Sequence, residues 1–377
     1  MQKPKVRFKG FTDDWEQRKL EELVGIYDGV HQTPDYQDSG IMFLSVENIA
    51  TLKSEKYISE EAFERDYKVY PEKGDILMTR IGDVGTTNVV ETAEKVAFYV
   101  SLALLKPNEI DSYFLSNAMK TNAFQKGLRE RTLVTAIPQK INKDEIGKID
   151  IFITNNDEEQ KKIGAYFSNL DHLITFHQRK CEQTKKLKKY MLQKMFPKEG
   201  QTVPEVRFEG FTDAWEKHKF SDVIEIGSGM DYKHLEEGNV PVYGTGGYML
   251  SVDKALSDDK DAIGIGRKGT IDKPYILRAP FWTVDTLFYC IPKEDYDLDF
   301  TSCLFQNVNW KKKDESTGVP SLSKVIINNV ETITPIFDEQ KKIGNYFQNL
   351  DHLITLHQRK CDELQNIKKF MLQNMFI

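Results

Sequence analysis

Few residues in this sequence have the types and spacing that an active site requires. Gly264, Gly266 and Gly269 fit the G-x-G-x-x-G pattern of a dinucleotide-binding loop, but such a loop should open a helix. The segment that follows them, TIDKPYILRAP, contains two prolines and is not helical. The related RIGDVG at 80–85 lacks the first glycine. We therefore interpret both segments as tight glycine turns that carry charged side chains.

No metal ligand set or activated nucleophile stands out. His172 and His177 are five residues apart, as are His352 and His357, and this spacing does not place two ligands on one helix face as a spacing of four would. The four cysteines form no Cys-x-x-Cys pair. The chain also lacks a phosphate loop and the adjacent prolines of amino-methyltransferase motifs. We therefore expect no metal site and no catalytic residue, which argues against a nuclease or a methyltransferase.

The length and composition indicate a globular protein of two domains. The chain has 377 residues, of which 40% are hydrophobic and 29% charged. No apolar run approaches the roughly 18–20 residues of a membrane span. The first residues, MQKPKVRFKG, do not resemble a signal peptide, and the cysteines suit a reducing environment, so we expect a cytoplasmic protein.

An internal duplication is the strongest signal in the sequence. The A block, VRFKGFTDDWEQRKL at 6–20, recurs at 206–220 with 10 of 15 positions identical. The B block, which begins EQKKIG and covers 159–196, recurs at 339–376 with 27 of 38 identical. The stretches between these blocks barely match. The order A, variable, B, A, variable, B predicts two copies of one module related by a pseudo-twofold axis.

Each B block predicts one long helix. Its apolar residues recur at steps of three and four over about 38 residues, with no proline inside, which corresponds to a helix of about 57 Å. Two such helices on one chain can bury each other as an antiparallel pair, although each could instead pack on its own domain. The predicted seam comprises Ile163, Phe167, Leu170, Ile174, His177, Cys181, Ile343, Phe347, Leu350, Ile354, His357 and Cys361.

The variable segments predict two small mixed α/β domains of the α+β kind, because short β-rich runs alternate with glycine turns and one helical stretch. Each segment ends on a similar phrase, TAIPQKI at 135–141 and TGVPSLS at 317–323. In the A blocks, Trp15 and Trp215 are candidate core residues, and Asp13 with Glu16 has capping-box spacing for a short helix. We expect domains at 1–156 and 198–336, and long helices at 157–197 and 337–377.

This organisation resembles the specificity subunits of type I restriction-modification systems over essentially the whole chain. The resemblance rests on the duplicated long helix that opens with EQKKI, on GFTDxW at the start of each half and on the TGVP-like phrase before each helix. It implies two target recognition domains, each reading one half of a split double-stranded DNA target, with the helices as a ruler between the halves. It also implies two methyltransferase subunits and motor-nuclease subunits as partners, which would hold S-adenosylmethionine, ATP and magnesium.

Base readout requires Arg or Lys for guanine and Asn or Gln for adenine, on loops that reach the grooves. The candidates on the glycine turns and neighbouring loops are Arg80, Asn88, Arg129, Arg131, Thr132, Tyr243, Thr245, Arg267, Lys268, Lys311, Lys312 and Ser316. Each of these could equally be a solvated loop residue.

The net charge of −6 is unusual for a DNA-binding protein, because phosphate contacts dominate affinity. Residues 157–196 carry nine basic and five acidic side chains, so the acidic excess lies mainly in the domains. We therefore expect weak DNA binding by the chain alone. The charge also fits an alternative, a coiled-coil scaffold that binds only proteins, but this alternative does not explain a repeated framework with divergent inserts.

Overall fold

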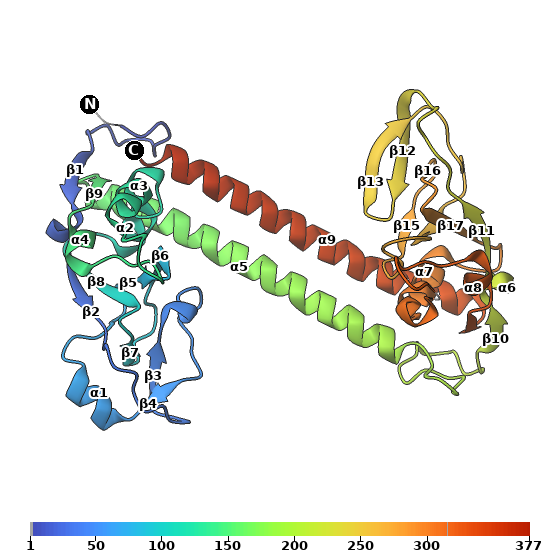
Figure 1. The fold of residues 1–377 in the computed structure, drawn as a ribbon, viewed down its shortest axis with the longest axis horizontal. Helices are drawn as coiled ribbons and strands as arrows, with labels where there is room; N and C mark the ends of the chain where they lie inside the picture. Colours follow the sequence, from blue (N-terminus) through green and yellow to red (C-terminus); the bar gives the residue numbers. More distant parts are fainter. Residues whose placement is uncertain (1–2, 315) are drawn as a thin grey trace. The chain divides into compact units, whose positions relative to one another are not determined.

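The computed structural model describes residues 3–314 and 316–377, which form two compact units. Unit 1 comprises Met1–His177 and Arg359–Ile377, and unit 2 comprises Gln178–Gln358. Both boundaries fall inside long helices, so each unit consists of one mixed α/β domain and parts of both helices (Figure 1). Unit 1 therefore combines the first part of the chain with the last turns of α9. No helix in the described part of the chain combines the length and the apolar character that crossing a bilayer requires.

The two long helices are α5 (Asp157–Lys194) and α9 (Phe337–Asn374), and each has 38 residues. They begin where the sequence predicted them to begin. In unit 1, Asp171 of α5 pairs with Lys368 of α9, and the ring of Phe167 lies 5.7 Å from that of Phe376. The helices are therefore antiparallel in this unit, because residue numbers fall along one as they rise along the other.

The same antiparallel pairing recurs in unit 2 with the roles of the helices exchanged. Lys188 of α5 pairs with Asp351 of α9 at 2.7 Å, and the rings of Phe196 and Phe347 are 6.2 Å apart. The Cys181 thiol donates to the carbonyl oxygen of Ile354.

The predicted seam is buried over most of its length. The first turns of each long helix pack both on their own domain and on the other long helix. Ile163 and Phe167 lie in one apolar cluster with Trp15 of their own domain and with Leu364 of the other helix. Each long helix thus packs on its own domain and on the opposite helix. The buried seam residues are Ile163, Phe167, Leu170, Ile174 and Cys361 in unit 1, and Cys181, Ile343, Phe347 and Leu350 in unit 2, whereas His177, Ile354 and His357 are half-buried.

The described part of unit 1 contains three sheets. An antiparallel sheet has the order β2 (Val24–Asp28), β8 (Leu102–Pro107), β5 (Ile76–Ile81) and β6 (Asp83–Val89). A second sheet has the order β4 (Tyr57–Ile58), β3 (Ile41–Leu44) and β7 (Val96–Phe98), and β3 runs parallel to β7. A third pairs β1 (Glu16–Lys19) with β9 (Asp150–Ile153). The short helices are α1 (Glu60–Asp66), α2 (Ser112–Ala118), α3 (Asn122–Arg131), α4 (Lys143–Gly147) and two 3-10 turns (Leu20–Glu22 and Val46–Asn48).

Unit 2 repeats this plan. Its four-stranded sheet has the order β11 (Ile224–Ser228), β17 (Leu287–Pro292), β14 (Ala262–Gly266) and β15 (Tyr275–Leu277). The three-stranded sheet is β13 (Gly247–Val252), β12 (Glu237–Gly244) and β16 (Trp282–Thr283), and the last sheet pairs β10 (Glu216–Lys219) with β18 (Glu331–Thr334). The helices are α6 (Phe220–Val223), α7 (Leu298–Asn307), α8 (Lys324–Asn328) and a 3-10 turn (Trp310–Lys313).

A β-strand begins near the end of each A block, so the prediction of a short helix after Asp13 is wrong. Glu16 begins β1, which pairs antiparallel with β9, and Glu216 begins β10, which pairs with β18. Pairing with a distant strand satisfies the backbone here and overrides the local capping signal. Trp15 and Trp215 are core residues as predicted, at 4% and 2% exposure.

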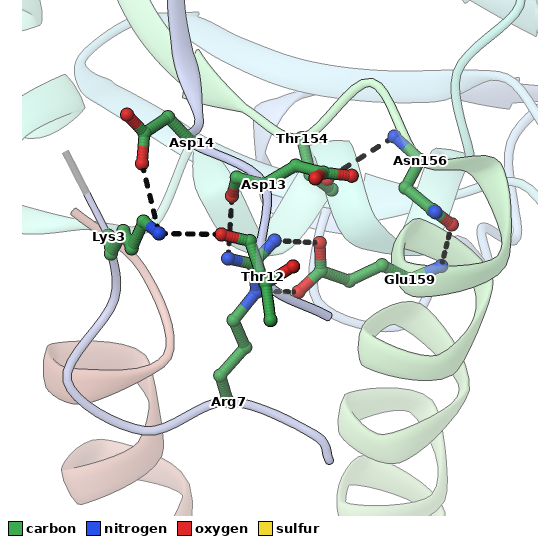
Figure 2. A network of polar contacts seen from close by, with 8 residues as sticks. All are labelled: Lys3, Arg7, Thr12, Asp13, Asp14, Thr154, Asn156 and Glu159. Atoms are coloured by element: carbon green, nitrogen blue, oxygen red, sulfur yellow. Dashed lines mark hydrogen bonds and ion pairs between the residues drawn. The ribbon is translucent and has the colours of Figure 1, made fainter. Parts of the chain in front are cut away.

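A buried ion pair joins the first A block to the start of α5. The Glu159 carboxylate is fully buried and accepts two hydrogen bonds from the Arg7 guanidinium, at 2.8 Å for the Nη2–Oε2 pair (Figure 2). The third arm of Arg7 donates to the carbonyl oxygen of Asp13 at 2.6 Å. In unit 2, Arg207 holds Glu339 through two bonds of 2.7 and 2.8 Å. A buried carboxylate in this position is stable only with such a bidentate partner.

Aromatic residues of the A block extend this contact along α5. The ring of Phe8 meets Tyr166 edge-on, and the Lys162 ammonium lies 4.9 Å from the centre of the Phe11 ring. The same two contacts recur in unit 2 between Phe208 and Tyr346 and between Phe211 and Lys342. The repeated V-R-F-x-G-F and E-Q-K-K-I-G-x-Y-F phrases are therefore the two sides of one interface.

Gly164 lets α5 approach the beginning of α2. The Asp111 carboxylate caps α2 by accepting from the Phe114 amide at 2.8 Å, and the Gln160 side chain accepts from the Asp111 amide at 3.0 Å. A Cβ atom on Gly164 would lie 2.2 Å from the Asp111 carboxylate oxygen. Gly344 has the same relation to Asp297 in unit 2, where the distance would be 2.3 Å.

We expect Gly164→Ala to destabilise the protein. The added methyl group must displace the cap of α2, and we expect this overpacking to cost about 1–3 kcal/mol, enough to offset the roughly 1 kcal/mol by which alanine favours a helix. Urea unfolding of the variant measures the change. Gly246→Ala, which places a methyl group in open space, is the control. A Gly164→Ala protein as stable as the control would contradict this account.

A half-buried lysine at the end of α2 should make stability depend on pH. Burial is the main cause that lowers the pKa of Lys120 to about 8, and the charge of Lys368 lowers it further while Asp171 opposes both. In the unfolded chain this pKa is about 10.4. Below pH 8 the amine is charged in both states and folding includes the full cost of its burial. As the pH rises from 8 to about 10.4 the folded protein no longer carries that cost.

We therefore expect Lys120→Met to raise the melting temperature at pH 7, and expect the gain to shrink as the pH approaches 10. Thermal unfolding followed by circular dichroism between pH 7 and 10 measures both effects, with the exposed Lys126→Met as the control. A gain that stays constant over this range would show that the charge of Lys120 is not its cause.

Candidate nucleic-acid interface

In unit 1 the TAIPQKI phrase is clamped onto the predicted glycine turn. β5 and β6 are joined at Gly82, whose φ of +83° suits glycine. The Gly82 amide donates to the carbonyl oxygen of Gln139 at 2.8 Å, and the Gln139 side chain donates back to the Gly82 carbonyl at 3.0 Å. The Ile141 amide donates to the carbonyl oxygen of Arg80 at 3.0 Å. Two segments about 60 residues apart therefore form one surface.

Unit 2 contains the same clamp. The Gly269 amide donates to the carbonyl oxygen of Pro320 at 2.8 Å, and the Leu322 amide donates to that of Arg267 at 2.9 Å. Lys268 and Ser321 form a β-bridge between these two bonds. The sequence singled out the glycine turns and the two phrases separately, and the structure brings them together in both units.

Two candidates of unit 1 point into the protein, away from the turn's surface. Arg80 is 6% exposed and its guanidinium pairs with Asp28, while burial lowers its pKa. The Asn88 amide donates to the carbonyl oxygen of Ile49 at 2.9 Å, and its side-chain oxygen accepts from the Val89 amide. Both side chains therefore have structural partners, which corrects the expectation that they extend from the turn toward bases.

The remaining candidates of unit 1 lie at the end of α3, directly before the clamped loop. Arg129 is exposed, whereas Arg131 is half-buried and lies 3.7 Å from Glu145. The Thr132 hydroxyl donates to the carbonyl oxygen of Leu128 at 2.7 Å. Arg129 is the member of this group whose charge faces solvent.

In unit 2 the candidates fall into two groups. Arg267 and Lys268 are exposed at the clamp, and Lys311 and Lys312 are exposed on the 3-10 turn before it. Lys311 pairs with Asp272 at 2.8 Å and lowers the pKa of that carboxyl group. Two others, Tyr243 and Thr245, lie on the separate β12–β13 hairpin, and the Tyr243 ring is 6.2 Å from that of Tyr275. The Ser316 hydroxyl is buried and has no hydrogen-bond partner among the described residues.

Exposed cations lie close to both clamps in the sequence. Arg129 and Lys140 lie beside the loop of unit 1, and Lys268, Lys312 and Lys313 lie beside that of unit 2. Within residues 3–314 and 316–377 these five side chains form no ion pair. These cations can contact phosphate groups, although exposed carboxylates also lie nearby, Asp83 next to Gly82 in unit 1 and Asp285 next to Thr286 in unit 2.

The sequence did not identify the residues that build the clamp or those that lie at its tip. The carbonyl oxygens of Gln139 and Pro320 hold the two glycine turns. The side chains of Ile137 and Val319, which come shortly before these two residues in the sequence, are exposed. The shared phrase was the available signal, because it recurs where the rest of the variable segments does not. Within the described residues no group of three or more histidine, cysteine or acidic side chains could hold a metal ion.

Comparison with known proteins assigns the family. The model described as "Type I restriction modification DNA specificity domain" matches residues 12–186 and 212–366, once in each repeat. The chain belongs to this family. The match confirms the resemblance to type I specificity subunits that the repeated blocks indicated.

Two relatives from Methanocaldococcus jannaschii are similar to this member of the family. The MjaVIII type I restriction enzyme specificity subunit is 24% identical over 56% of this chain and 58% of its own length. The putative MjaX specificity subunit is 24% identical over 97% of this chain and 93% of its own length. Among solved structures, the S subunit of a type I restriction-modification system from M. genitalium has the same fold, with a TM-score of 0.76 and 17% identity over 100% of this chain and 99% of that one.

The different environments of Arg80 and Lys268 lead to a prediction. We expect Arg80→Met to lower the free energy of unfolding by about 1–2 kcal/mol, because it removes a buried partner of Asp28. Lys268→Met should change it by less than about 0.5 kcal/mol, since the lysine is exposed and has no ion pair in the described structure. Urea unfolding of the two variants measures both changes. If the Arg80→Met variant is as stable as the wild type, the structural role of Arg80 is wrong and Arg80 is again a candidate for DNA contact.

Proposed function

We propose that this specificity subunit reads a bipartite, asymmetric DNA target, one half with each unit, and directs adenine methylation and cleavage by partner subunits. The observation that carries the proposal is the clamp, in which a glycine turn and the loop before the long helix are joined by the same hydrogen bonds in both units. The backbone of the clamp is the same in both units, whereas the side chains around it differ. This combination suits two DNA-contacting surfaces that have the same construction and recognise different bases.

The side chains around each clamp have the chemistry that groove readout requires. Arginine and lysine donate to guanine in the major groove and also neutralise phosphates. Arg129 and Lys140 supply these groups in unit 1, whereas Arg267, Lys268 and Lys312 supply them in unit 2. Because the two sets differ in number and position, the two halves of the target should differ in sequence.

The charge of the chain indicates that it does not hold DNA alone. The net charge is −6, and a protein that relied on its own phosphate contacts would carry a basic excess. We infer that partner subunits supply most phosphate contacts and that this chain supplies contacts to bases.

The long helices offer equivalent surfaces to two copies of one partner. In unit 1, Leu173 and Phe176 of α5 are exposed, and the corresponding residues of α9 in unit 2, Leu353 and Leu356, are exposed as well. Large apolar side chains on an outer helix face are typical of protein-binding surfaces. Two equivalent sets support the binding of two methyltransferase subunits, each acting on an adenine in one half of the target.

In this proposal the chain itself has no catalytic site. Methyl transfer with S-adenosylmethionine belongs to the methyltransferase subunits, and ATP- and magnesium-dependent cleavage belongs to motor-nuclease subunits. The competing proposal of a scaffold that binds only proteins gives the clamps no role, whereas readout of DNA gives them one.

Co-expression of the chain with the methyltransferase of its system, followed by mapping of methylated adenines, tests the proposal. We expect a motif of two unlike parts separated by a fixed gap of unspecified bases. Exchange of residues 20–150 for those of a relative should change one part and leave the other and the gap unchanged.

The matched control is the reciprocal exchange of residues 220–330, which should change only the other part. A single uninterrupted motif would contradict the proposal, as would an exchange that alters both parts at once. Absence of any methylation that depends on this chain would favour the protein-binding scaffold.

A further inference from the structure

Each clamped loop carries an exposed β-branched residue at the third position of its TAIP or TGVP phrase, two residues before Gln139 in unit 1 and one residue before Pro320 in unit 2. Ile137 of the TAIP phrase is 100% exposed, and Val319 of the TGVP phrase is 55% exposed. An isolated exposed apolar side chain is common on protein surfaces. The same kind of side chain directly before the proline of two otherwise dissimilar loops indicates a common role.

In both units, hydrogen bonds close the loop at its base and hold this residue outside the core. In unit 1, Leu133 and Lys140 face each other across the loop, with the Leu133 amide donating to the Lys140 carbonyl at 2.8 Å. In unit 2, the Asp314 carboxylate accepts from the amides of Ser316 and Ser321, both at 3.0 Å, and these bonds lower its pKa. The apolar tips are therefore presented by a supported backbone.

The neighbouring charges favour DNA as the ligand of these tips. Arg129 and Lys140 lie on the segments that flank Ile137, and Lys312 and Lys313 precede the loop that carries Val319. All four are exposed and form no ion pair in the described part of the chain. An apolar side chain between cations matches a duplex, in which the base stack lies between phosphate strands.

If the two loops have a common role, the part of the DNA that they contact must be present in both halves of the target. Bases that differ between the halves are excluded by this requirement, but the adenine that is methylated in each half meets it. A methyltransferase must extrude its target base from the stack, which costs unstacking free energy and leaves a gap. Apolar side chains are known to enter the base stack at protein–DNA interfaces.

We propose that Ile137 and Val319 contact the duplex at the base pair of the methylated adenine, one in each half, and occupy the space that the extruded base leaves. This inference rests on the proposed function. It gives the loops a role in positioning the base for the partner methyltransferase, separate from the recognition of the other bases.

Ile137→Ala and Val319→Ala in the complex with the methyltransferase test the inference. We expect Ile137→Ala to slow methylation at the half-site of unit 1 by at least about tenfold, because most of the apolar contact is lost, and to leave the other half-site unchanged. Val319→Ala should have the opposite pattern. Ile137→Leu, which keeps an apolar side chain of the same size, should retain most of the wild-type methylation rate at the half-site of unit 1.

Base extrusion can be measured separately with 2-aminopurine in place of the target adenine of one half-site. The increase in its fluorescence on binding should fall in the alanine variant of the unit that reads that half. Val134→Ala, 70% exposed in the same loop, and Val325→Ala, 67% exposed in unit 2, are controls that should behave as the wild type.

The outcomes separate this inference from the proposed function. If the wild-type complex methylates both halves and the alanine variants match it in rate and fluorescence, the inference is wrong and the function stands. Loss of the methyltransferase from the complex in size-exclusion chromatography would assign the loops to protein binding and overturn the inference. If the wild-type complex methylates no bipartite site, the proposed function itself fails.

Discussion

The buried carboxylate at the start of each long helix is the interaction on which the rest of each unit depends. Glu159 and Glu339 have no exposed surface, and a carboxylate in such a place requires a cation with good geometry. Arg7 and Arg207 supply it through two parallel hydrogen bonds each. The start of the helix is therefore stable in its buried position only with the A block docked on it.

Docking of the A block brings the two ends of each domain together. Once Arg7 is fixed on α5, the chain that follows it lies beside the chain that precedes the helix, and β1 pairs with β9 across more than 130 residues of sequence. The same closure joins β10 to β18 in unit 2. The segment between the two paired strands of each unit therefore begins and ends at the same two-stranded sheet. The segments between the closures can therefore diverge, provided that each one returns to its own strand.

Periodicity and repetition predicted the elements well, because both are properties of neighbouring residues. The starts of α5 and α9, the buried seam residues and the two core tryptophans follow from such local patterns, whereas both helices end three residues before the predicted limits. Glu159 was missed because a charged residue in the first turn of a helix is ordinarily a solvated capping residue. Arg80 was assigned to a loop surface because nothing near it in sequence reveals that Asp28 lies beside it.

Contacts between distant segments carried the part of the candidate site that the sequence did not predict. The bonds from Gly82 to Gln139 and from Gly269 to Pro320 span 57 and 51 residues and have no periodic signature. Their consequence is chemical as well as structural. A turn that is held by backbone bonds leaves its side chains free to vary, so each unit can present different cations on the same support. The exposed residue before the proline of each phrase is β-branched and apolar in both units, as expected if both loops contact the same part of the ligand.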